Sequence, residues 1–266
     1  MKNFLYSLFI GLFGIAALTS IAFLLMYAVQ SKQQAHLYSD LAAVRKQDTQ
    51  QETASEPEKQ ASYQNLYWEN TDMVGWILIE DTNIDYPVMQ TPTDPTYYLK
   101  HDFEKNYTDY GCPFMQADCD ALAPSDNLIL YGHNMKDGTM FGRLTQYEKS
   151  IDYLKAHPFV DFSTLWHQER YVIFAVVDVS LDTSSENFLD YFAHPRFSSD
   201  AEFASYIRRA ELASMYAIPM DVKPSDALLT LSTCLEENRL VVIARRQRDG
   251  ESKASLRETV NMAVRQ

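Results

Sequence analysis

The segment that decides the fold is ALLTLSTCLEENRLVVIA, residues 227–244. Two largely apolar runs, 227–233 and 240–244, flank a short polar stretch that contains Cys234 and Arg239. This pattern predicts two strands of a buried sheet, with a thiol at the end of the first strand and a cation just before the second.

A second apolar run, 127–131, stops at Gly132 and His133. Two strands therefore end on residues that can do nucleophilic or acid–base chemistry, and rigid strand ends hold such residues in place. A thiol is a good nucleophile only as the thiolate, so it needs a basic or cationic neighbour. An arginine cannot serve as a base, but it can stabilise an oxyanion. Taken alone, each residue is more often a core or surface residue than a catalytic one.

Further strands are predicted on both sides of these runs, at 75–79, 84–89, 113–116, 159–162 and 170–179. Helical spacing marks 33–46, 63–67, 140–149 and 203–212, with Ser199 or Asp200 as an N-cap for the last. About eight short strands with helices between them predict a mainly β fold, a closed or nearly closed barrel.

The exact strings resemble those of the sortase family. ThrLeuSerThrCys at 230–234 resembles the family's nucleophile strand, TyrGlyHis at 131–133 its histidine strand, and Arg239 the arginine that heads its last strand. The resemblance extends to GlyTrpIleLeuIle at 75–79, IleAspTyrProVal at 84–88 and TyrTyrLeu at 97–99. An N-terminal apolar run and a long insertion, 181–226, before the cysteine strand make the chain most similar to class B.

This resemblance implies an eight-stranded sortase-type β-barrel with N-terminal helices and a helix inserted before the cysteine strand. It implies a cysteine transpeptidase in which Cys234 attacks a sorting signal, His133 transfers protons and Arg239 supports the oxyanion. Leu99, Tyr131 and Ser232 fall where class B relatives contact the sorting peptide. Pro95 stands where those relatives often have asparagine, so a side-chain contact is lost there.

The resemblance also implies the partners. They are surface proteins or pilins that carry a sorting signal, and an acceptor amine of a peptidoglycan precursor or of a pilin. No metal and no organic cofactor is expected. The net charge of −13 gives no global attraction to phosphate backbones, so nucleic acid is not expected as a partner.

One departure from the family concerns the connection between the last two strands. Four residues separate Cys234 from Arg239, fewer than in most relatives. Either the connection is a tight turn, or Arg245 or Arg246 takes the role of Arg239. Two other classes of protein stay open: another cysteine–histidine enzyme, such as a hydrolase or an L,D-transpeptidase, and a catalytically inactive, membrane-tethered binding domain.

The N-terminal part of the chain predicts a membrane anchor. Residues 4–29 include no charged residue, and these 26 residues exceed the roughly 20 that a helix needs to cross a bilayer. The alternative is a cleaved signal peptide, whose apolar region is shorter. We predict an anchor at 1–30, a spacer at 31–62, a catalytic domain at 63–248 and a polar tail at 249–266. The expected location is the cell membrane, with the catalytic domain outside. Whether Cys112 and Cys119 pair is left open.

Overall fold

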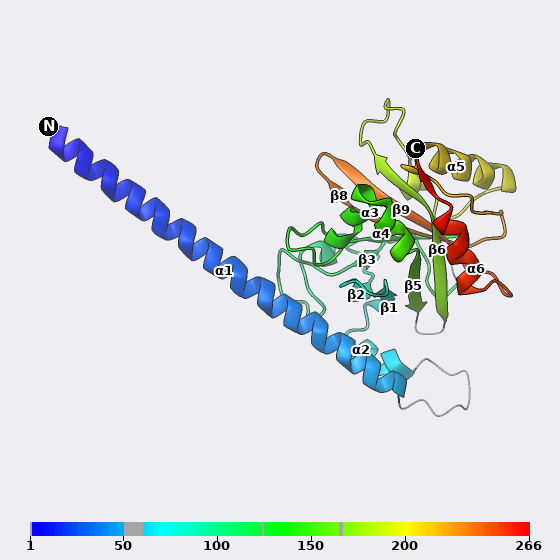
Figure 1. Ribbon diagram of the computed structural model, residues 1–266. Coiled ribbons are helices and arrows are strands. Elements are labelled where there is room, and N and C mark those ends of the chain that lie inside the picture. The colour runs from blue at the N-terminus through cyan, green and yellow to red at the C-terminus, as the bar shows by residue number, and fades with distance from the viewer. Residues whose placement is uncertain (1, 51–60, 124, 165–166) are drawn as a thin grey trace. The chain divides into compact units, whose positions relative to one another are not determined.

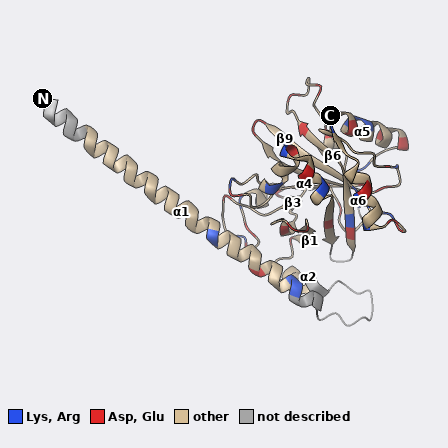
Figure 2. Ribbon diagram, viewed as in Figure 1, with Lys and Arg blue, Asp and Glu red and all other residues tan. Residues whose placement is uncertain are grey.

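The computed structural model describes residues 2–50, 61–123, 125–164 and 167–266. Its contacts divide the chain into two compact units, Met1–Asp40 and Leu41–Gln266. Helix α1 (Lys2–Gln50) provides the whole of the first unit that is described (Figure 1). Within the described residues, one segment, Phe9–Lys46, is long and apolar enough to cross a membrane, and the mean hydropathy of its most apolar 18 residues is 2.3. Its apolar stretch carries none of the charged residues coloured in Figure 2.

The second unit is built on a closed barrel, as predicted. Its strands, in the order in which they are hydrogen-bonded around the barrel, are β1 (Met73–Leu78), β2 (Asp85–Met89), β3 (Phe114–Met115), β4 (Asn127–Tyr131), β8 (Leu228–Leu235), β9 (Asn238–Arg246), β6 (Gln168–Val179) and β5 (Phe159–Thr164). The fold is therefore mainly β, and the prediction of an eight-stranded barrel is confirmed.

The central strands read as continuous apolar runs because both of their faces are covered. In β6 and β9, the segments 171–177 and 240–244 are buried at every residue. Helix α5 (Asp200–Ala213), the predicted inserted helix, packs on β6 and buries Phe203, Tyr206, Ile207 and Ala210. It begins at Ser199, whose hydroxyl accepts a hydrogen bond from the Glu202 amide as an N-cap.

The pairing of β4 with β8 positions the candidate site. These strands are parallel, with Tyr131 opposite Ser232, so their carboxyl ends lie at the same edge of the barrel. Strand β8 then turns directly into β9, with Cys234 opposite Arg239 and Leu235 opposite Asn238. The connection is thus a two-residue turn of Glu236 and Glu237. Glu236 has a φ of 50°, a left-handed conformation that such turns require and that costs a non-glycine residue some strain.

Other helices and a small sheet surround the barrel. The helices are α2 (Ala61–Glu69), α3 (Thr145–Lys149), α4 (Ile151–Ala156) and α6 (Lys253–Asn261), with 3-10 turns η1 (Tyr97–Leu99), η2 (Gly142–Leu144) and η3 (Tyr191–Ala193). Strands β7 (Tyr216–Ala217) and β10 (Val264–Arg265) pair with each other. The helix predicted over 140–149 is instead a 3-10 turn followed by one short α-helix.

Both flanks of the predicted catalytic domain contact it. In α1, Leu41 and Ala42 are buried, and Arg45 lies over the Trp76 ring and pairs with Asp85 at 3.2 Å. At the other end, the residues predicted as a polar tail form α6 and β10 and bury Leu256, Val260 and Ala263. The contact boundary between the two units lies at 40/41, and residues 51–60 of the predicted spacer are outside the described residues.

An ion pair between a buried arginine and a partly exposed glutamate fixes the start of this C-terminal segment. Arg245 is 1% exposed, and its two Nη atoms donate to the two carboxylate oxygens of Glu251 at 2.7 Å each. These hydrogen bonds from Arg245 lower the pKa of Glu251 below its ordinary value of 4.5. An arginine does not lose its proton, so protonation of Glu251 leaves a buried cation without its counter-charge.

We expect Glu251→Gln to destabilise the protein by about 2–3 kcal/mol, because a buried guanidinium loses a charged acceptor. The depressed pKa means that the stabilisation is complete above about pH 4.5 and is lost as the pH falls through the folded-state value. Urea unfolding at pH 7 and at pH 4 measures both effects, and the variant should lose less stability than the wild type over this interval. Glu258→Gln, an exposed change on α6, is the control. Equal stability of Glu251→Gln and Glu258→Gln would show that the pair contributes nothing.

Candidate active site

Cys234 lies at the exposed end of β8, one residue before the turn. Its position is fixed from both sides: Asn134 donates to the Cys234 carbonyl at 2.8 Å, and the preceding Thr233 hydroxyl donates to the Gly132 carbonyl at 2.8 Å. Among the described residues, the Cys234 thiol makes no hydrogen bond. The sulfur is therefore held at the barrel edge by its backbone and stays open to a substrate.

His133 follows β4 by two residues and so lies beside the end of β8. Its Nε2 is 2.7 Å from the Leu99 carbonyl, and a carbonyl can only accept, so Nε2 carries a proton. In the neutral ring, Nδ1 then has the free lone pair, and no described residue bonds to it. Gly132 leaves no room for a side chain here, because a Cβ would lie 2.6 Å from the buried Phe141 ring.

The tight turn brings Arg239 opposite Cys234 in the β8–β9 ladder. Residues paired in this way have Cβ atoms about 4.5–5.5 Å apart on one face of the sheet. The Arg239 guanidinium donates to the Asn238 carbonyl at 3.1 Å, and its other N–H groups have no partner among the described residues. Burial raises the pKa of Tyr191, and the nearby charge of Arg239 opposes that rise. The guanidinium therefore lies close enough to Tyr191 to influence the ionisation of its hydroxyl.

The two alternative arginines are placed elsewhere. Arg245 is opposite Leu228, at the far end of β8, about 20 Å from Cys234 at 3.3 Å per strand residue, and is bound to Glu251. Arg246 pairs with Glu169 at 3.3 Å. The short connection is thus a tight turn, and Arg239 is the arginine that lies beside the thiol.

A pocket of about 660 Å³ opens beside these three residues. All six residues singled out from the sequence line it: His133, Cys234 and Arg239 with Leu99, Tyr131 and Ser232. Pro95 also lines it. No sequence signal marked the lining residues Thr96, Phe114, Gln116, Ala117 and Asp118, nor Tyr191, whose hydroxyl lies 2.8 Å from that of Ser232. Gly132 and Thr233, which belong to the motifs around His133 and Cys234, complete the lining. Most of the exposed surface of this pocket is apolar, which suits an extended peptide.

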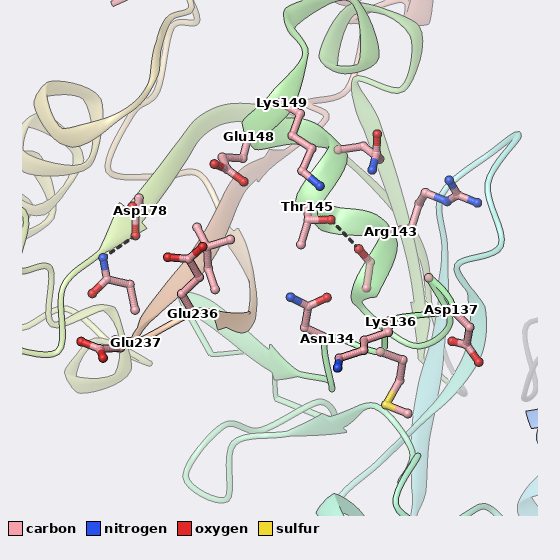
Figure 3. A pocket seen from close by; sticks show the side chains of 16 residues that line it. Asn134, Lys136, Asp137, Arg143, Thr145, Glu148, Lys149, Asp178, Glu236 and Glu237 are labelled. Carbon is pink, nitrogen blue, oxygen red and sulfur yellow. Dashed lines mark hydrogen bonds between the residues drawn. The ribbon is translucent and has the colours of Figure 1, made fainter. Parts of the chain in front are cut away.

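A second hollow, of about 950 Å³, lies around the turn that follows Cys234 (Figure 3). Leu235 and Asn238, the neighbours of Cys234 and Arg239, line it, and so does Asn134. Figure 3 shows charged side chains of both signs around it. The Asn238 amide donates a hydrogen bond to Asp178 at 2.8 Å. The charged lining residues are Lys136, Arg143 and Lys149, with Asp137, Glu148, Asp178, Glu236 and Glu237.

The other two cysteines are buried. The Cys112 thiol donates to the Pro87 carbonyl and the Cys119 thiol to the Asn127 carbonyl, both at 3.5 Å. Burial raises the pKa of Cys119 to about 11, so this thiol stays protonated near neutral pH. An exposed thiol, an imidazole and a guanidinium at one barrel edge, beside a peptide-sized pocket, fit a cysteine-dependent acyl-transfer enzyme.

Comparison with known proteins agrees with this class. A model of the sortase domain family matches residues 77–247. The chain is 34% identical over 178 residues to sortase B of Listeria monocytogenes, covering 65% of this chain and 69% of that protein. It is 29% identical over 188 residues to sortase B of Staphylococcus aureus, covering 69% and 73%. The chain therefore belongs to the sortase family, whose members are cysteine transpeptidases.

Solved structures place the chain in class B. A crystal structure of sortase B from Bacillus anthracis superposes with a TM-score of 0.71 at 28% identity, covering 82% of this chain and 97% of that one. The predicted class, barrel and transpeptidase function are thereby confirmed. The roles of individual residues stay predictions that rest on the geometry above.

We expect iodoacetamide at pH 7.5 to label Cys234 before the two buried cysteines, because the Cys234 thiol is exposed and the other two must be uncovered first. Peptide mapping by mass spectrometry after timed quenching measures the three rates. Cys234→Ala should remove the fast phase, and Cys119→Ala should keep it. Labelling of Cys119 at the rate of Cys234 would contradict the placement of the reactive thiol.

Proposed function

We propose that this sortase cleaves a Thr–Gly or Thr–Asn type bond in the sorting signal of a secreted protein, with Cys234 as nucleophile. The proposal rests on one observation above all, the register that sets Cys234 opposite Arg239 and beside His133 at a pocket wide enough for a peptide. Sortases act on sorting signals and amine nucleophiles. For this chain, the proteins that carry the signal are surface proteins or pilins.

In the first half of the reaction, the Cys234 thiol gives its proton to His133, the sulfur attacks the carbonyl carbon of the threonine, and a carbon–sulfur bond forms. The carbonyl oxygen gains negative charge, which the unpartnered N–H groups of Arg239 stabilise. The carbon–nitrogen bond then breaks, and the leaving amine takes a proton from His133. Because Nε2 donates to the Leu99 carbonyl, Nδ1 is the ring atom that exchanges this proton.

In the second half, an acceptor amine attacks the thioester, gives a proton to His133 and releases Cys234 with a new peptide bond. The second hollow lies directly beside the first pocket, because Leu235 and Asn238 line the second and their chain neighbours Cys234 and Arg239 line the first. This arrangement supports an approach of the acceptor amine from the side of the turn. Its five carboxylates outnumber its three cationic side chains, and this balance favours an ammonium group. A peptidoglycan precursor or a pilin lysine would supply such an amine.

We further propose that the apolar part of α1 anchors the chain in the cell membrane, with the catalytic unit outside. The segment has the length and the hydropathy for one crossing. A membrane-bound position matches a cell-envelope reaction, because secreted precursors and their acceptors are both found there.

The roles of Arg239 and Cys234 can be tested by kinetics. Cys234→Ala should abolish transfer of a peptide with a Thr–Gly or Thr–Asn bond to hydroxylamine, measured as hydroxamate. Arg239→Ala should lower kcat by a factor of about 10²–10³ with a small change in KM. The reason is that the oxyanion develops in the transition state and is absent from the bound substrate. Arg239→Lys should recover part of this loss.

Arg246→Ala is the matched control, since it removes a cation from the same strand at the end remote from Cys234. The assignment fails if Arg246→Ala loses kcat and Arg239→Ala keeps it. Retained turnover in Cys234→Ala would exclude the thioacyl mechanism.

The anchor can be tested by fractionation. The full chain should sediment with membranes and resist extraction by carbonate, whereas a chain that begins at Leu41 should be soluble and should keep its activity on a peptide. Starting at Leu41 keeps the Arg45–Asp85 pair. Recovery of a shortened chain lacking residues 1–30 from the medium of wild-type cells would favour a cleaved signal peptide.

A further inference from the structure

Arg239 has one hydrogen bond among the described residues, and its acceptor belongs to the residue just before it in the chain. The Nη1 atom of the guanidinium donates to the Asn238 carbonyl at 3.1 Å. An arginine side chain has several rotatable bonds, so a single hydrogen bond restricts it only as far as the acceptor is itself fixed. The position of the Asn238 carbonyl therefore decides where the charge of Arg239 lies.

The backbone of Asn238 is paired on one side only. On that side it is opposite Leu235 and closes the two-residue turn, in which Glu236 has a φ of 50°. On the other side, the ladder between β6 and β9 ends with Val179 opposite Arg239, so Asn238 lies one residue beyond the last pair. Within the described part of the chain, Asn238 is attached to β6 by its side chain.

Asp178 of β6 provides this attachment. Asn238 Nδ2 donates to Asp178 Oδ1 at 2.8 Å, and Figure 3 draws this bond as the dashed line that ends on Asp178. Asp178 is opposite Leu240, two residues after Asn238, so the side chains of Asp178 and Asn238 lie on the same face of the sheet. Cys234 and Arg239, which are paired with each other, share the opposite face. The link from Asp178 to Arg239 therefore runs through the backbone of Asn238.

We propose that Asp178 is a positioning residue for the reaction: it fixes the Asn238 side chain, and the Asn238 carbonyl then holds the Arg239 guanidinium where the oxyanion develops. Donors stabilise an oxyanion at about 2.7–3.1 Å, so a displacement of about 1 Å is enough to lower the rate substantially. Asp178 lies on the face of the sheet away from the thiol, so it acts through Arg239. This inference rests on the proposed function for the role of Arg239.

The first half of the reaction isolates this role, because it involves no acceptor amine. Its rate is measured as single-turnover release of the leaving peptide from a substrate with a Thr–Gly or Thr–Asn bond. Asp178→Ala should lower this rate about tenfold, less than Arg239→Ala, because the guanidinium is still present and reaches the oxyanion part of the time. Asp249→Ala, the same substitution at an exposed site, should leave the rate unchanged. An unchanged rate in Asp178→Ala overturns the inference and leaves the proposed role of Arg239 standing.

A double-mutant cycle separates positioning from a general loss of structure. In the Arg239→Ala background there is no guanidinium to position, so Asp178→Ala should change the rate by less than about twofold. A purely structural role of Asp178 would give the same loss in both backgrounds, and that result would overturn the inference. Arg239→Ala alone tests the proposed function. If its rate equals that of the wild type, the proposed mechanism fails, and the inference fails with it.

An exchange of the two side chains tests the hydrogen bond itself. A carboxylate can only accept, so Asn238→Asp sets two acceptors against each other and should lower the rate at least as far as Asp178→Ala. Asp178→Asn combined with Asn238→Asp restores a donor and an acceptor in reverse order, with the net charge of the wild type. This double variant should recover the rate to within about threefold of the wild type. Failure to recover, in a protein whose circular dichroism spectrum matches that of the wild type, overturns the inference.

Asp178 also lines the second hollow, so binding of the acceptor is the alternative role. The two roles differ in the step that they affect. Positioning predicts a slower first half, where the first oxyanion forms, with little change in the KM for triglycine as acceptor. If Asp178→Ala instead keeps the rate of the first half and raises only the KM for triglycine, the carboxylate binds the amine and the inference is wrong.

Discussion

The parallel pairing of β4 with β8 is the constraint on which the site depends. The two strands come from segments about 100 residues apart in the chain, and their five-residue register makes both end at one edge of the barrel. The imidazole, the thiol and the peptide pocket all follow from that register. A shift by one residue would turn each side chain of the strand to the opposite face of the sheet and separate these groups.

Strand β9 shows how environment gives one residue type two different uses. Arg239 and Arg245 are six residues apart in the same strand, so both point to the same face of the sheet. Arg239 keeps most of its N–H groups available beside an exposed thiol, whereas both Nη atoms of Arg245 donate to Glu251 and hold the C-terminal segment. A buried cation bound to a carboxylate stabilises the fold, and an accessible one is available for a transient charge.

The sequence predicted the barrel and the three central site residues because each depends on local signals. Apolar runs bounded by polar turns located the strands, and the motifs around His133 and Cys234 located the site. Pocket residues such as Gln116 and Asp118 were not predicted, because their place in the pocket comes from pairing between strands that are distant in the chain. Strands β7 and β10 were not predicted either, since a two-residue strand has no periodicity to detect. The C-terminal segment looked polar because few of its residues, Leu256 and Val260 among them, face the barrel.

The two-residue turn after Cys234 leaves little protein to cover the sulfur. An enzyme with a long connection at this place could fold it over a bound acyl group, but Glu236 and Glu237 are too few to form a cover. A thioester formed here would remain in contact with bulk solvent. Its lifetime would then be set by competition between water and amine, so the ratio of hydrolysis to transfer should depend on how much acceptor the envelope supplies locally.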